Sequence, residues 1–92
     1  ALIVGIVLNN KNKAVLGGPD IQSRGVIYLK DSENIMKEVG NILESTIERL
    51  VKERKYDNIS ARNEARDLMS KYIYKQTGKR PMILPVIIEI RV

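Results

Sequence analysis

The apolar residues of this chain change their spacing twice, and these changes limit the folds open to it. In residues 2–30 they form short runs, broken by turn-forming residues, that are typical of strands. From Ser32 to Gln76 they recur every three or four residues, as on one side of a helix. After Pro81 the strand pattern returns. Because strands flank a pair of helices, we predict an α+β fold.

Three strands are predicted before the helices. The first is the run from Leu2 to Leu8, which ends at a turn of Asn and Lys residues. Lys13 to Leu16 is expected to return as a short second strand. Gly17-Gly18-Pro19-Asp20 is then expected to form a turn, because two glycines and a proline disfavour a regular ladder. Gly25 to Lys30 is a further strand candidate.

Two helices are predicted next. The first begins at Asp31 or Ser32, either of which can cap an N-terminus, and runs for about five turns. The second runs from about Ser60 to Gln76, with Gly78 as its C-terminal cap. Each helix carries one apolar stripe: Ile35, Val39, Ile42, Leu43, Ile47 and Leu50 on the first, and Ala61, Ala65, Leu68, Met69, Tyr72 and Ile73 on the second.

The last stretch, Met82 to Val92, is a predicted strand. Pro85 is expected at its start or at an unpaired position, because proline has no N–H. The element order is then β-β-β-α-α-β, with two helices packed on one face of a small mixed sheet of three to four strands. The first strand nevertheless has apolar residues on both faces. We therefore expect the uncovered face to pack against something outside this chain, and we assign Val4, Ile6 and Ile87 to it.

Composition excludes several kinds of chemistry. The chain has no Cys and no His, so it offers no thiolate nucleophile, Cys/His zinc site, histidine base or disulfide. No apolar run reaches the roughly 20 residues that a membrane-spanning helix needs, and we expect a cytoplasmic protein without a membrane partner. The sequence starts and stops beside apolar runs, so residues 1–92 are expected to be a single domain of a larger protein.

The net charge of +5 comes from 16 basic and 11 acidic side chains. The basic excess lies in residues 1–30 and 58–80, which indicates contact with phosphates. Arg24, Lys79 and Arg80 are the candidate contacts to RNA. Structural explanations stay open: Arg24 can pair with Asp20, and the other two can neutralise the C-terminal end of the second helix.

Helical geometry argues against a strong RNA-binding surface. At about 100° per residue, Arg62 and Arg66 lie on one flank of the second apolar stripe, and Lys71 and Lys75 lie on the other. They do not form one cationic ridge. Tyr72 belongs to the core stripe and the other three tyrosines are scattered along the chain, so we expect no aromatic platform for unpaired bases.

Two motifs carry a resemblance to a known family. Gly18 to Tyr28, of sequence GPDIQSRGVIY, and Lys79 to Glu89, of sequence KRPMILPVIIE, flank the predicted helices. They are similar to the C-terminal domain of ribonuclease J, a ribonuclease of the β-CASP branch of the metallo-β-lactamases. The likeness extends over nearly the whole chain.

The resemblance implies an accessory domain of an RNA-degrading enzyme. The family hydrolyses phosphodiester bonds as a 5′-to-3′ exonuclease and as an endonuclease, with zinc or manganese held by His and Asp of its metallo-β-lactamase core. This chain has no His, so we assign it no catalytic, cofactor-binding or metal-binding residue. The implied role is oligomerisation and support of full activity, with a second copy, a paralogous subunit or the parent catalytic domain as partner. The alternative is an RNA-binding module that delivers substrate to the parent active site.

Overall fold

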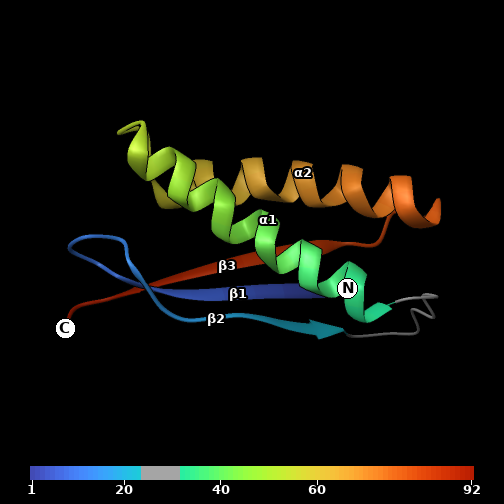
Figure 1. The fold of residues 1–92 in the computed structure, drawn as a ribbon, viewed down its shortest axis with the longest axis horizontal. Helices are drawn as coiled ribbons and strands as arrows, with labels where there is room; N and C mark the ends of the chain where they lie inside the picture. The colour runs from blue at the N-terminus through green and yellow to red at the C-terminus, as the bar shows by residue number, and fades with distance from the viewer. Residues whose placement is uncertain (24–31) are drawn as a thin grey trace.

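The computed structural model describes residues 1–23 and 32–92. Its elements follow the chain in the order β1 (Leu2–Asn9), β2 (Val15–Ser23), α1 (Ser32–Lys52), α2 (Asn58–Thr77) and β3 (Ile83–Ile90). Both helices lie on one side of a three-stranded sheet (Figure 1). The predicted α+β class and the helix layer are confirmed. The strand candidate at residues 25–30 and the cap candidate Asp31 lie outside the described residues.

β1 is the central strand of the sheet, and β2 and β3 are its edges. β1 pairs antiparallel with β2, to which a short turn joins it. It pairs parallel with β3, because the helices carry the chain back to the end where β1 began. The parallel ladder runs without a break from Leu2 opposite Ile83 to Asn9 opposite Ile90. Pro85 is the third residue of β3, opposite Val4, and not the first residue of the strand as predicted.

Asn side chains hold the turn between β1 and β2. The Asn9 N–H donates to the carbonyl of Ala14 at 2.8 Å, and the Lys13 N–H donates back to the carbonyl of Asn9 at 2.8 Å. The side-chain oxygens of Asn9 and Asn12 accept hydrogen bonds from the N–H groups of Lys11 and Ala14, at 2.8 and 2.9 Å. These bonds are the reason why an Asn-rich run favours a turn.

β2 continues through the segment that was expected to form a turn. A second strand returns after the turn, as predicted, but it spans Val15–Ser23 and not Lys13 to Leu16, and the prediction of a turn at residues 17–20 is wrong. An edge strand tolerates proline and an irregular register, because only one side of it must pair. The register with β1 shifts between Gly5 and Val7, and opposite this shift Gly18 takes a φ of 85°. The glycines and Pro19 therefore mark an irregularity within the edge strand and not its end.

Both helices match their predicted ranges closely. α1 spans 21 residues, and α2 begins at Asn58, two residues before the predicted start. Asp57 caps α2, because its carboxylate accepts hydrogen bonds from the Ser60 N–H at 2.8 Å and from the Ser60 hydroxyl at 2.6 Å. These bonds lower the pKa of Asp57. Neither α1 nor α2 contains an apolar stretch of the length that crosses a bilayer.

Gly78 ends α2, as predicted, in a left-handed conformation with a φ of 72°. Replacing it with Ala should lower the free energy of unfolding by about 1 kcal/mol, because a Cβ is strained at this φ. No atom lies within 4 Å of the position of that Cβ, so no clash adds to the strain. Gly78→Asn should lose less, since Asn tolerates this conformation better. Urea denaturation of the three proteins measures the difference, and an unchanged Ala variant would contradict the expectation.

The core lies between the helices and one face of the sheet. The buried stripes are Ile35, Val39, Leu43, Ile47 and Leu50 of α1, Ala61, Ala65, Met69 and Ile73 of α2, Leu2, Val4, Ile6 and Leu8 of β1, and Ile83 and Ile87 of β3. Leu68 departs from its predicted stripe and is 42% exposed. The assignment of Val4, Ile6 and Ile87 to the outward face is wrong, since their exposures are 0%, 1% and 7%.

The two faces of β1 explain this error. Its inner face carries four large aliphatic residues, whereas its outer face includes Gly5 and Asn9. Covering the inner face with helices therefore buries more apolar area. Ile87 follows, because the register sets it beside Ile6. Glu89 lies on the same face of β3, and its carboxylate has partners inside the protein.

Candidate functional sites

The sheet has an apolar face on the side opposite the helices. β3 exposes four aliphatic side chains in alternation, which are 38–51% exposed: Leu84, Val86, Ile88 and Ile90. Ile3 and Val7 of β1 and Leu16 of β2 extend the same face. We call these seven residues the sheet face. The prediction of an uncovered apolar face is therefore correct, although the residues assigned to it were those of the opposite face.

The sheet face differs from an ordinary solvent-facing surface. Strands with one face in water usually place polar residues there. The outward positions of β3 are all aliphatic, and those of β1 carry no charge. Contiguous exposed apolar residues mark interaction sites far more often than single ones do. The sheet face is thus a candidate docking surface.

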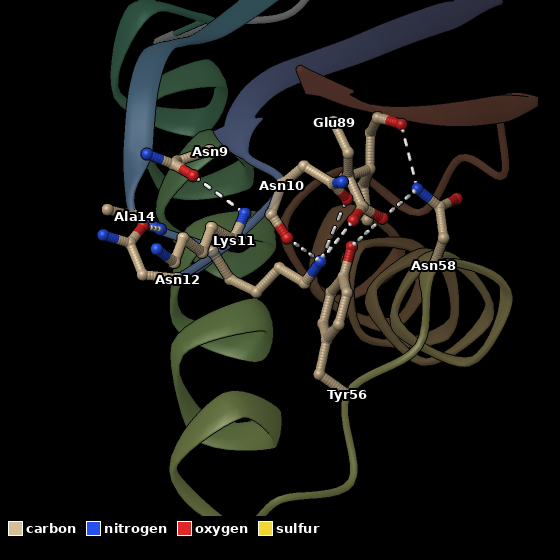
Figure 2. Close-up of polar contacts among 10 residues, drawn as sticks. Asn9, Asn10, Lys11, Asn12, Ala14, Tyr56, Asn58 and Glu89 are labelled. Carbon is tan, nitrogen blue, oxygen red and sulfur yellow. Dashed lines mark hydrogen bonds and ion pairs between the residues drawn. The ribbon is translucent and has the colours of Figure 1, made fainter. Parts of the chain in front are cut away.

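A polar cluster joins β3 to the β1–β2 turn and to the start of α2 (Figure 2). The Lys13 ammonium nitrogen lies 2.7 Å from one carboxylate oxygen of Glu89. The other oxygen accepts hydrogen bonds from the Tyr56 hydroxyl at 2.8 Å and from the Asn58 amide at 3.0 Å. That amide also donates to the carbonyl of Ile87 at 3.0 Å. The Lys13 and Glu89 side chains are only 24% and 19% exposed.

The electrostatics of this cluster suit a structural role. The hydrogen bond from Lys13, followed by that from Asn58, holds the pKa of Glu89 below its ordinary value. Burial, together with the bond to Glu89, raises the pKa of Tyr56 far above its ordinary value. A general acid or base works best with a pKa near the operating pH, and both groups are moved away from neutrality. Within residues 1–23 and 32–92, no three His, Cys, Asp or Glu side chains lie where they could hold a metal ion.

The second candidate site lies at the C-terminal end of α2. The Arg80 guanidinium lies over the ring of Tyr74, with its central carbon 4.2 Å from the ring centroid. These two residues, Ser70 and Lys71 line an open pocket of about 270 Å³. We call these four residues the basic pocket. No aromatic platform was expected from the sequence, but Tyr74 lies against a basic residue.

The three predicted RNA contacts do not share one location in the structure. Arg80 lines the basic pocket, and Lys79 precedes it as an exposed residue. Arg24 lies outside the described residues. Sequence reasoning missed Ser70, Lys71 and Tyr74 as partners of Arg80. Their spacing on one helix face, followed by the chain reversal at Gly78, is the signal that identifies them.

One family model matches the part of the sequence that contains all five elements and both candidate sites. Residues 1–90 match the Ribonuclease J C-terminal domain. Similar proteins include Ribonuclease J 2 of Staphylococcus epidermidis, 36% identical over 88 residues, and Ribonuclease J 2 of Staphylococcus aureus, 35% identical over 88 residues. Each alignment covers 96% of this chain and 16% of the relative, so the chain spans a small part of those proteins. The chain belongs to the ribonuclease J family, as its C-terminal domain.

Proposed function

We propose that this chain is the assembly domain of a ribonuclease J enzyme and that it pairs with a second copy through the sheet face. The parent enzyme would act in the cytoplasm, as a 5′-to-3′ exonuclease and an endonuclease. A metallo-β-lactamase core with zinc or manganese would carry out the phosphodiester hydrolysis. This chain contributes subunit contacts and no catalytic group. The exposed aliphatic stripe of β3 is the observation that carries the proposal.

The stripe has the chemistry of a subunit interface. Complete burial of one large aliphatic side chain contributes about 1.5–3 kcal/mol relative to leaving it in water. β3 presents four such side chains in a row, each already partly covered by its neighbours. A rigid sheet holds them in place, so little conformational entropy is lost when they dock. Burial of this surface therefore favours association, and little conformational entropy is lost in the process.

Charge favours the sheet face over the rest of the surface for contact between two copies of the chain. Two copies each carry a net charge of +5 and repel one another at most orientations. The outward positions of β1 and β3 are uncharged, so contact there avoids setting cations against cations. A two-fold axis through such a face sets the stripe of one copy against that of the other. The sheet face is therefore the surface best suited to self-association.

The test compares lysine substitutions at two aliphatic positions of similar exposure. Ile88 is 51% exposed within the sheet face, and Leu68 is 42% exposed on α2, in the helix layer. Sedimentation equilibrium of the 92-residue chain should show a reversible dimer. Ile88→Lys should raise the dimer dissociation constant at least about tenfold, because the two-fold axis brings two unpaired ammonium groups into an apolar contact. Leu68→Lys adds the same charge and should change the constant less than about twofold.

Two outcomes would contradict the proposal. The first is an unaltered chain that remains monomeric at a concentration on the order of 1 mM. The second is an equal loss of dimer from both variants, which would locate the contact elsewhere or attribute it to net charge. Circular dichroism of each variant confirms that a lost dimer is not a lost fold.

A further inference from the structure

We propose that the basic pocket binds single-stranded RNA, with one unpaired base stacked on the Arg80–Tyr74 pair and the adjoining phosphate held by Lys71 and Ser70. The pocket is lined by residues of α2 and by Arg80 of the segment that leads to β3. In that segment the chain bends back on itself (Figure 1). It belongs to the helix layer and shares no residue with the sheet face. The proposal thus adds a ligand site to the assembly role and does not depend on it.

The Arg80–Tyr74 pair is a preformed stacking surface. With 4.2 Å between its central carbon and the ring centroid, the guanidinium lies in contact with the ring. Tyr74 is still 46% exposed, so this contact leaves much of its side chain open to solvent. Unpaired bases stack on aromatic rings and on guanidinium planes in protein–RNA complexes. The contact with Tyr74 also restricts the long Arg80 side chain before any ligand arrives, which lowers the entropy lost on binding.

The charge around the pocket suits a phosphate chain. Residues 67–88 hold four basic side chains and one acidic side chain, Asp67, which stands one turn before Lys71 on α2. None of the four forms an ion pair with a described carboxylate, in contrast to Lys13 and Arg49, which both do. Lys71 and Lys75 stand four positions apart on α2, where like charges repel and destabilise a helix. The four basic and one acidic side chains leave this segment a net charge of +3, which favours an anionic ligand.

Arg80 does not act by bonding the carbonyl groups at the end of α2. Two of these carbonyl groups accept hydrogen bonds from other donors. The Gly78 N–H bonds to the carbonyl of Tyr74 at 2.8 Å, and the Thr77 hydroxyl bonds to that of Ile73 at 2.8 Å. The Arg80 guanidinium is directed to a ring and not to a carbonyl.

The size and composition of the pocket indicate the class of ligand. An open pocket of about 270 Å³ has room for a single base or phosphate group. The Ser70 hydroxyl and Lys71 ammonium supply hydrogen-bond donors to phosphate oxygens. An acidic peptide would pair with the cations but would not stack on the Arg80–Tyr74 pair. Single-stranded RNA uses both, and because every base has a flat face, the site should show little sequence preference.

The test is fluorescence anisotropy of a labelled uridine decamer titrated with the 92-residue chain at low salt. Tyr74→Ala and Arg80→Ala should each weaken binding at least about fivefold, since each removes half of the stacking pair. Arg80→Lys keeps the charge but loses the planar group, and should weaken binding about as much as Arg80→Ala. Arg66→Ala is the matched control: it removes an exposed cation from the same helix, outside the pocket, and should change affinity less than about twofold.

Salt and competition separate the possible outcomes. Affinity should fall steeply with salt, and Lys71→Ala should reduce the slope of log affinity against log salt by about 0.7. No binding at low salt would overturn the proposal. Equal losses from Arg66→Ala and Arg80→Ala would overturn the site, because net charge alone would then explain binding. A glutamate decamer that competes as well as the RNA would overturn the stacking assignment and identify a general anion surface.

Discussion

Glu89→Ala is expected to lower the free energy of unfolding by about 2–3 kcal/mol. Glu89 is the acceptor for three donors, Lys13, Tyr56 and Asn58. Its removal leaves the donors in a place that is only partly open to water. The loss is therefore larger than for an exposed ion pair, which contributes about 0–1 kcal/mol. Chemical denaturation of the 92-residue chain at neutral pH measures it.

Acid should reveal the same interaction. Because the pKa of Glu89 is lower in the folded than in the unfolded protein, its ionised form stabilises the fold. That stabilisation is complete above the unfolded-state pKa of about 4.3 and is lost as the pH falls through the folded-state pKa. Glu89→Gln should be less stable than the unaltered chain at neutral pH, and the difference should shrink below about pH 4.

Tyr56→Phe is the control for this cluster. It removes one neutral donor to Glu89 and leaves the ion pair with Lys13 in place. It should lower stability by about 1 kcal/mol and keep the acid-dependent loss. A Glu89→Gln variant whose deficit stays constant from neutral pH to about pH 3 would contradict the role assigned to the carboxylate charge.

Gly18→Ala is expected to lower the free energy of unfolding by about 2–4 kcal/mol. The φ of 85° at this position strains any side chain. A Cβ there would also lie 2.8 Å from the carbonyl oxygen of Gly5, a backbone atom of the central strand. Relief of this contact requires β2 to move away from β1, which weakens the hydrogen bonds between them.

The preceding glycine provides the matched control. A Cβ at Gly17 would lie 3.9 Å from the Cβ of Val7, an ordinary contact, and the residue has no positive φ. Gly17→Ala should therefore change stability by less than about 0.5 kcal/mol. Equal losses from the two variants would show that the local geometry of Gly18 is not the cause. Thermal and chemical denaturation of both proteins distinguish these outcomes.

The helices could be predicted from sequence because their determinants are local. A stripe that repeats every three or four residues fixes α1 and α2, and Gly78 ends α2 through its own backbone freedom. The extent of β2 could not be predicted in this way. Glycine and proline end a strand that must pair on both sides, but they only interrupt an edge strand, which pairs on one side. That depends on the position of the strand in the finished sheet, which the segment itself does not encode.

The choice of sheet face shows a second limit. β3 alone favours burial of Leu84, Val86, Ile88 and Ile90, whereas β1 alone favours the opposite face. The helices cover the face that β1 favours. Glu89 can lie on that face because residues from two other segments bind its carboxylate. Tyr74 and Arg80 likewise meet through the bend after α2. Each of these contacts is tertiary, so composition and periodicity do not reveal it.

The position of β3 also bears on how the domain folds. β2 pairs with β1 as soon as the intervening turn closes, but the strand that fills the other edge of β1 comes only after both helices. Contacts between residues so far apart in the chain form slowly. On a ribosome, one edge of β1 would therefore lack its hydrogen-bonding partner until β3 emerges. During that interval the edge is open to strands of neighbouring nascent chains, and protection by a chaperone would matter most then.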